Sequence, residues 1–249
     1  MIWSHEAGPE GAPLVVLVHG AMDRSAGMLK VSRQLDDSFR VARFDRRGYG
    51  RSKPSDGPFS MDAQVDDLRE VLAGRRALVF GHSYGGNVAL GLAARHPELA
   101  RAVAVYEVPL SWMGWWPGYS RRNPGNLQGT AADAAERFMR RMIGNARWDS
   151  LSARTRDDRR AEGDAFVGEL ADLAAGPPWA DAQIDVPFVA MYGELAREHH
   201  RDSSHLLAEL LSGPTPAPAI EIAGAAHNGP FTHAGPVAAV IRDLARRAP

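Results

Sequence analysis

The sequence predicts an α/β fold in which helices flank a mostly parallel central sheet. Three features of the 249 residues predict it: short unbroken apolar runs rich in valine, helical patterns between these runs, and turn residues at the run ends. Unbroken apolar runs are typical of strands buried on both faces, and strands that alternate with helices form parallel sheets. Such folds bind ligands at the carboxyl ends of the strands, so we expect the chemistry there.

The first strand is predicted over residues 14–18, an apolar run between Pro13 and a turn at His19-Gly20. Five similar runs follow, at residues 40–44, 77–80, 102–106, 187–192 and 219–223. Their short length and turn-forming flanks favour strands over helices. A single core domain accommodates all six strands.

The segments between the strands have helical spacing. Residues 60–72 begin with Ser60, a residue type that favours the N-cap position, and they place Val65, Leu68 and Leu72 on one face. Two further helices are predicted at residues 87–95 and 236–246.

Residues 109–185 break the alternation, because they contain no convincing strand. Helical patterns at 130–144 and 155–175 predict an inserted helical lid, and residues 1–108 and 186–249 then form the core domain. The insertion holds five of the six tryptophans, Trp112, Trp115, Trp116, Trp148 and Trp179. Core packing of a small lid explains these residues better than stacking on a ligand.

Composition excludes several functions. The 29 Lys and Arg residues are balanced by 30 Asp and Glu residues, so there is no basic excess to bind nucleic acid. With no cysteine, disulfides, thiolate metal sites and cysteine nucleophiles are excluded. The N-terminal residues do not resemble a signal peptide and no apolar run approaches 18 residues, so we expect a soluble cytoplasmic protein without membrane contact. The oligomeric state stays open.

The strongest motif is Gly81-His82-Ser83-Tyr84-Gly85, which follows a predicted strand and opens a predicted helix. A G-x-S-x-G turn in that position exposes the serine hydroxyl at the head of a helix, whose N–H groups favour developing negative charge. Ser83 is therefore the predicted nucleophile. A tight turn without chemistry is the alternative.

A serine hydroxyl needs a base to act as a nucleophile. His227 follows the last predicted strand and precedes the last helix, at the same end of the sheet as Ser83. His199, His200 and His205 are expected to be solvated surface residues. We expect His82 to point away from the nucleophile, and His227 is the predicted base.

The predicted first strand ends in His19-Gly20-Ala21-Met22. A backbone N–H in this turn can join the N–H after the nucleophile to bind an oxyanion. Ala21 and Tyr84 are the predicted donors.

These motifs resemble the α/β-hydrolase superfamily, in particular its lid-bearing esterases, lactonases and C–C hydrolases. The resemblance rests on His19-Gly20, the segment Asp45-Arg46-Arg47-Gly48-Tyr49-Gly50-Arg51-Ser52, the serine turn and His227, in that order. It covers essentially the whole chain. The Asp45 to Ser52 segment is a structural signature in this family, and we assign it no catalytic role.

The chain departs from the family pattern at the acid of the catalytic triad. The family usually places this acid three residues beyond a glycine after the post-lid strand, and here that position is Ala196, after Gly193. Glu107 follows the strand after the serine helix, an alternative acid position in some members, including certain haloalkane dehalogenases. The resemblance therefore implies a Ser83, His227 and Glu107 triad. Other acids near the usual loop are Glu194, Glu198 and Asp202.

A serine hydrolase of carboxylic esters, thioesters or lactones is the function expected from these residues, with an acyl-enzyme on Ser83 and no metal or organic cofactor. The predicted substrate is a small hydrophobic ester, contacted by Met22, His82, Trp112 and Trp115. The alternatives are a C–C bond hydrolase at the same site and a non-catalytic binding protein that has lost its acid. Epoxide hydrolases and haloalkane dehalogenases carry aspartate in the position of Ser83, which argues against both.

Overall fold

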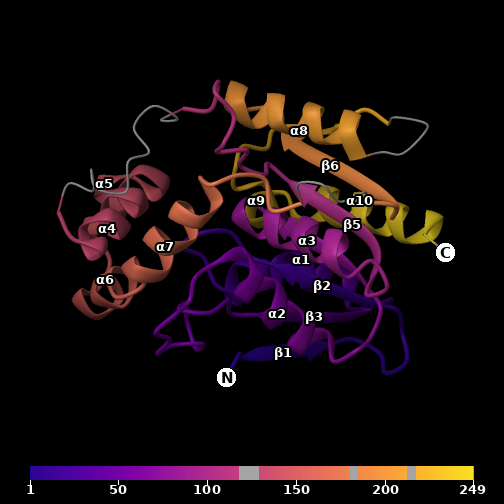
Figure 1. The fold of residues 1–249 in the computed structure, drawn as a ribbon, viewed down its shortest axis with the longest axis horizontal. Coiled ribbons are helices and arrows are strands. Elements are labelled where there is room, and N and C mark those ends of the chain that lie inside the picture. Colours follow the sequence, from indigo (N-terminus) through magenta and orange to yellow (C-terminus); the bar gives the residue numbers. More distant parts are fainter. Residues whose placement is uncertain (118–128, 180–183, 212–216, 249) are drawn as a thin grey trace.

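The computed structural model describes residues 1–117, 129–179, 184–211 and 217–248. Its centre is a seven-stranded sheet with the order β1-β3-β2-β4-β5-β6-β7 (Figure 1). The strands are β1 (Ser4–Ala7), β2 (Leu14–Val18), β3 (Arg40–Phe44), β4 (Ala77–His82), β5 (Ala100–Tyr106), β6 (Phe188–Gly193) and β7 (Ile220–Ile222). All neighbouring pairs are parallel except β1 and β3. The predicted fold class is confirmed.

Strand β1 is the one strand that the apolar runs do not indicate. It lies at the sheet edge and pairs antiparallel with β3, with Ser4 opposite Phe44. Its residues are exposed or half-buried. An edge strand of this kind has no need of an apolar run, so its sequence carries no such signal.

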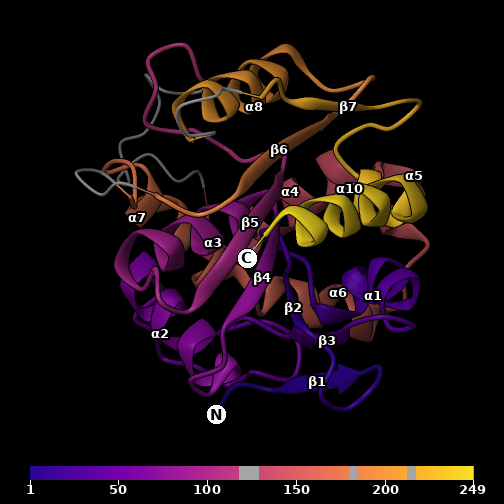
Figure 2. The same ribbon diagram turned by 90° about the vertical axis from the view of Figure 1, so that its right-hand side faces the viewer.

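Helices cover both faces of the sheet, as Figures 1 and 2 show. Helices α1 (Leu29–Leu35) and α10 (Ala234–Arg247) pack on one face, while α2 (Met61–Leu72), α3 (Tyr84–Arg95) and α8 (Glu198–Leu211) pack on the other. The short helices η1 (Ser25–Met28) and α9 (Gly229–Thr232) lie in loops near the carboxyl ends of the strands. Ser60 caps α2 as predicted, since its side chain accepts a hydrogen bond from the Ala63 N–H.

Between β5 and β6 the described residues form four helices: α4 (Ala131–Ile143), α5 (Asn145–Asp149), α6 (Ala153–Arg160) and α7 (Gly163–Leu173). They form a layer beside the core, at the left of Figure 1. Their apolar side chains pack around the fully buried Trp148, in a cluster that also includes Met22 and Tyr49 of the core. Residues 118–128 and 180–183 of the predicted insertion lie outside the described residues, and its role as a lid stays a prediction.

The single helix predicted over 155–175 is wrong, because the chain turns between α6 and α7. At Gly163 a Cβ atom would lie 2.4 Å from the Ala131 backbone, so α7 begins where it approaches α4 closely. The buried Glu162 carboxylate accepts hydrogen bonds from Arg24 in the core at 2.7 and 3.0 Å. This tertiary contact overrides a helical pattern that is continuous in the sequence.

Over the described residues, no helix combines the length and apolarity needed to span a bilayer.

Candidate active site

Four of the predicted site residues follow the carboxyl ends of parallel strands of the sheet. Ala21 comes after β2, Ser83 after β4, Glu107 after β5 and His227 after β7. Because the strands are parallel, their ends meet at one edge of the sheet. The chain therefore brings these residues to the carboxyl ends of the strands, which is where the sequence predicts the site.

Ser83 occupies a strained backbone conformation, with φ 52° and ψ −125°. The turn is tight enough that a Cβ at Gly81 would lie 2.4 Å from the Gly85 carbonyl oxygen, and one at Gly85 would lie 2.4 Å from the Val18 carbonyl oxygen. Only glycine fits at either position, which explains the spacing of the motif. The turn places Ser83 on the wall of a cavity at the head of α3.

His227 is oriented by Glu107. The distance from His227 Nδ1 to Glu107 Oε2 is 2.7 Å, and the Gly193 N–H donates to Glu107 Oε1 at 3.0 Å. Glu107 is fully buried, whereas His227 lies on the cavity wall. A carboxylate that accepts a hydrogen bond from Nδ1–H keeps the proton on Nδ1 and leaves Nε2 as the basic nitrogen. Two backbone features therefore hold the acid: the end of β5, which carries it, and the end of β6, which donates to it.

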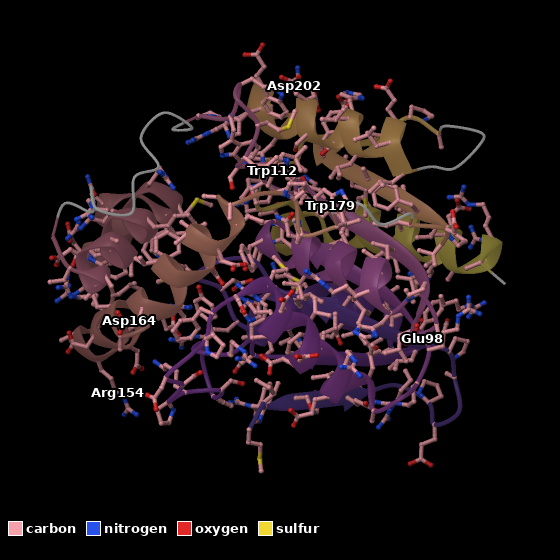
Figure 3. All side chains as sticks on the ribbon, in the orientation of Figure 1. Glu98, Trp112, Arg154, Asp164, Trp179 and Asp202 are labelled. Carbon is pink, nitrogen blue, oxygen red and sulfur yellow. The ribbon has the colours of Figure 1, made fainter. Side chains whose placement is uncertain are left out.

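The other acids considered from the sequence do not meet His227. Glu194 accepts a backbone hydrogen bond from the loop after β7, at 2.7 Å. Glu198 and Asp202 are exposed on α8, and Asp202 points away from the sheet (Figure 3). Ala196 lies in the turn after β6, where its N–H donates to the Gly193 carbonyl. Among these carboxylates, only Glu107 contacts the histidine.

The predicted oxyanion donors, Ala21 and Tyr84, line the same cavity as Ser83. Tyr84 is the first residue of α3, so its N–H has no partner within the helix. Within residues 1–117, 129–179, 184–211 and 217–248, neither the Ala21 N–H nor the Tyr84 N–H donates a hydrogen bond. Both are free to bind an oxygen that develops negative charge.

Arg46 fixes the turn that carries Ala21. Its guanidinium is buried and donates to the carbonyls of His19 and Gly20, each at 3.0 Å. In a trans peptide the carbonyl and the N–H point in opposite directions, so holding the Gly20 carbonyl on Arg46 turns the Ala21 N–H away from it. The segment from Asp45 to Ser52 was expected to have a structural role. The sequence did not predict that its Arg46 holds the turn that carries Ala21.

The cavity beside Ser83 has a volume of about 670 Å³. Helices α4 and α7 supply much of its apolar wall, including Phe138, Phe166 and Leu170. The core contributes the reacting groups from the ends of its strands. The space is thus enclosed jointly by the core and by the helices between β5 and β6.

The four predicted substrate contacts do not line this cavity, and that prediction is corrected. Met22 is buried in the cluster around Trp148, and His82 is buried behind His227, with its Nε2 2.8 Å from the His227 carbonyl oxygen. Trp112 packs edge-on against Trp179, and Trp115 is 43% exposed. The tryptophan that lines the cavity is Trp116. The side chains of the adjacent Trp115 and Trp116 point in different directions, and the residue type alone does not reveal which of them faces the cavity.

His200 is not the solvated surface residue that the sequence suggested. It lies on the cavity wall, and its ring stacks on His227 with centroids 4.5 Å apart and an interplanar angle of 23°. Burial holds the pKa of His200 well below its usual value, so its ring is neutral. The signal in the sequence was the helical spacing of 198–211, whose buried face includes Ser203, Ser204 and Leu207.

Glu107, His200 and His227 each offer a ligand atom, and these atoms lie within 4.8 Å of one another. A metal ion binds in the plane of an imidazole ring, and the two stacked rings do not direct their nitrogens at one point. The geometry fits a carboxylate-oriented base with a neutral ring stacked upon it.

The model of the alpha/beta hydrolase fold family matches residues 13–163. The chain belongs to this family. A proline iminopeptidase of Neisseria meningitidis serogroup B is 30% identical over 152 residues, which cover 57% of this chain and 49% of that protein. One of Xylella fastidiosa is 30% identical over 200 residues, which cover 74% of this chain and 59% of that protein. The chain spans about half the length of the first of these relatives.

Among solved structures, the enol-lactonase of Burkholderia xenovorans LB400 superposes with a TM-score of 0.76 at 22% identity, over 98% of this chain and 96% of that one. At this identity the likeness shows the fold alone. The family model and the structural likeness thus both indicate the α/β hydrolase fold.

Proposed function

We propose that this α/β hydrolase is a serine hydrolase that cleaves a carboxylic ester, thioester or lactone through an acyl-enzyme on Ser83. The observation that carries the proposal is the buried Glu107 carboxylate, 2.7 Å from His227 Nδ1. The usual acid position holds alanine, and without an acid a serine and histidine pair lose about 10⁴ in rate. Glu107 supplies the missing charge from the neighbouring strand end.

In this mechanism His227 Nε2 takes the Ser83 hydroxyl proton as the oxygen attacks the ester carbonyl. The carbonyl oxygen becomes an oxyanion, which accepts hydrogen bonds from the Ala21 and Tyr84 N–H groups. Glu107 stabilises the imidazolium, which then protonates the leaving alcohol. Water attacks the acyl-enzyme by the same steps and releases the acid.

Peptide hydrolysis is the activity that the names of the two iminopeptidase relatives suggest. A peptidase that grips a charged amino terminus needs a carboxylate in its cavity. No Asp or Glu lines the cavity within the described part of the chain. Glu107 is already bound to His227 and Gly193. The charge of the cavity therefore favours an ester over a peptide with a free amino terminus.

A fluorophosphonate probe tests the nucleophile, and 4-nitrophenyl butyrate tests turnover. Wild-type protein should be labelled and should release nitrophenol, whereas Ser83→Ala should do neither. Glu107→Gln should lower kcat by about 10⁴, because the glutamine cannot stabilise an imidazolium. Asp202→Asn, which removes an exposed carboxylate from the same end of the molecule, is the matched control and should keep wild-type kcat. A collapse of Asp202→Asn with Glu107→Gln intact would refute the assignment.

A further inference from the structure

Two arginines stand out on the cavity wall. Arg141 belongs to α4, and Arg197 belongs to the turn between β6 and α8, so the two reach the cavity from different layers of the molecule. Apart from histidines, they are the only side chains among the described residues lining it that can carry a charge at neutral pH. The described wall of the cavity beside Ser83 is thus largely apolar, carries two arginines and has no Asp or Glu.

Neither arginine pairs with an acidic side chain that the structure describes. Within the described part of the chain, no carboxylate forms an ion pair with Arg141 or Arg197. The neighbouring Arg140 contrasts with them, since it pairs with Glu136 at 2.8 Å and Asp149 at 2.9 Å. Helix α4 therefore uses one of two adjacent arginines for structure and leaves the other unpaired at the cavity.

The two unpaired cations also act on each other. Partial burial and the nearby positive charge of Arg197 lower the pKa of Arg141. The Arg141 guanidinium lies 5.1 Å from the Phe138 ring centroid, a contact that holds it beside the apolar wall. Bringing two like charges together without a counter-ion destabilises the protein, and an anionic ligand would relieve the repulsion.

We propose that Arg141 and Arg197 form a subsite for a carboxylate of the substrate. This proposal rests on the proposed ester hydrolysis at Ser83 and narrows its substrate to an ester with a free carboxylate on an apolar body. A guanidinium presents a fork of N–H donors that matches the two coplanar oxygens of a carboxylate. The apolar wall formed by Phe138, Phe166 and Leu170 would contact the carbon chain between this carboxylate and the ester.

The test compares mono-4-nitrophenyl esters of dicarboxylic acids, from glutaric to sebacic acid, with the same compounds methylated at the free carboxylate. At the best chain length, wild-type kcat/KM should favour the charged ester by about tenfold or more, the effect of one charge-assisted contact. In Arg141→Gln/Arg197→Gln the ratio of charged to neutral ester should fall to about one. The ratio is the readout because a general loss of activity cancels from it.

Arg137→Gln is the matched control. Arg137 lies one turn before Arg141 on α4, is exposed and does not line the cavity, so its loss removes one positive charge, as each of the two substitutions in the double variant does. It should keep the wild-type ratio. No preference at any chain length, or an equal fall of the ratio in Arg137→Gln, would overturn the carboxylate subsite while leaving ester hydrolysis intact.

If no ester is turned over, the proposed hydrolysis is overturned, and the carboxylate subsite is then tested by a binding measurement. Calorimetry with Ser83→Ala protein and monomethyl suberate should then show binding that is lost when both arginines are replaced by glutamine in the same background. Equal binding by the two proteins, or binding by neither, would overturn the subsite.

Discussion

Backbone strain marks the residues of the site. Of the residues that the structure describes, four that are not glycine have positive φ: Met22, Ala73, Ser83 and Glu107. Ala73 ends helix α2, where a left-handed residue is common. The other three are Met22, which follows the predicted oxyanion donor Ala21, the proposed nucleophile Ser83 and the proposed acid Glu107. Strained non-glycine residues persist where the surroundings fix them, and they concentrate at functional sites.

Asp23 offers a residue-scale prediction of pH dependence. Its Oδ2 is buried without a hydrogen-bond partner among the described residues, and burial raises the pKa of Asp23 to about 7. Arg159 and Arg46 lower this pKa and Asp45 raises it, but burial dominates. Between the ordinary carboxyl pKa and about 7, the folded protein binds a proton that the unfolded chain releases. Stability therefore falls as pH rises through this window.

Asp23→Asn should remove this loss of folding stability at high pH. Its Tm should match the wild type near pH 4 and exceed it above pH 7, with each kcal/mol gained raising the Tm by about 2–4 °C. Thermal melts across this pH range measure the difference. Asp37, an exposed carboxylate paired with Arg242, is the control, and Asp37→Asn should show no such gain. A Tm difference for Asp23→Asn that is the same at both pH values would contradict the prediction.

Residue-scale prediction from the sequence succeeded where a backbone rule fixes the residue. The place of Ser83 in a tight turn was predictable because its glycine neighbours have no room for a side chain, and that of Glu107 because it follows a strand, while the catalytic roles of both stay predictions. His200 was not predictable, since its contact with His227 joins two segments through their tertiary arrangement. The sequence did not predict that Trp116 lines the cavity in place of Trp115, for the same reason.

At the scale of elements, a buried ion pair couples the core to helix α7. Arg46 lies 2.7 Å from Glu169, both side chains are about 1% exposed, and Glu169 also accepts a hydrogen bond from Tyr49. The same guanidinium holds the carbonyls of His19 and Gly20. Helix α7 and the oxyanion turn thus share one side chain.

Arg46→Met should destabilise the protein by about 3–5 kcal/mol, because it leaves the Glu169 charge buried and unpaired. Arg46→Met/Glu169→Gln should recover much of this loss, since the glutamine removes the charge and still accepts from Tyr49. Urea unfolding measures both variants. The double variant should nevertheless keep a lowered kcat, because the Gly20 carbonyl then loses the guanidinium and keeps only its contacts with His19 Nδ1 and the Asp23 N–H. Recovery of stability and kcat together would show that Arg46 does not position the turn.

Elements were predicted well where local signals coincide with tertiary packing. Helix α2 has a capping serine and an apolar face, and it begins and ends where expected. Helices α6 and α7 share a continuous helical pattern, but the close approach at Gly163 and the buried Glu162 separate them. Strand β1 and helix α8 were missed because one is a polar edge strand and the other begins in a run of charged residues and histidines.

At the scale of the whole molecule, the cavity belongs to neither layer alone. The strand ends supply Ser83 and His227, while α7 supplies apolar side chains such as Leu170. The order of elements predicted the edge of the sheet where the site lies. It could not predict the shape of the space, which depends on how the helices between β5 and β6 pack against the core.

Leu170→Trp should shorten the acyl chain that the cavity accepts, because Leu170 lies on its wall and indole is larger than isobutyl. Each methylene buried in the transition state is worth about 0.8 kcal/mol, so losing room for two should lower the ratio of kcat/KM for octanoate to that for acetate by about tenfold. Competing hydrolysis of the two 4-nitrophenyl esters measures the ratio. Leu210, 63% exposed on α8 and outside the cavity wall, provides the control Leu210→Trp. An unchanged ratio in Leu170→Trp would mean that the acyl chain binds away from α7.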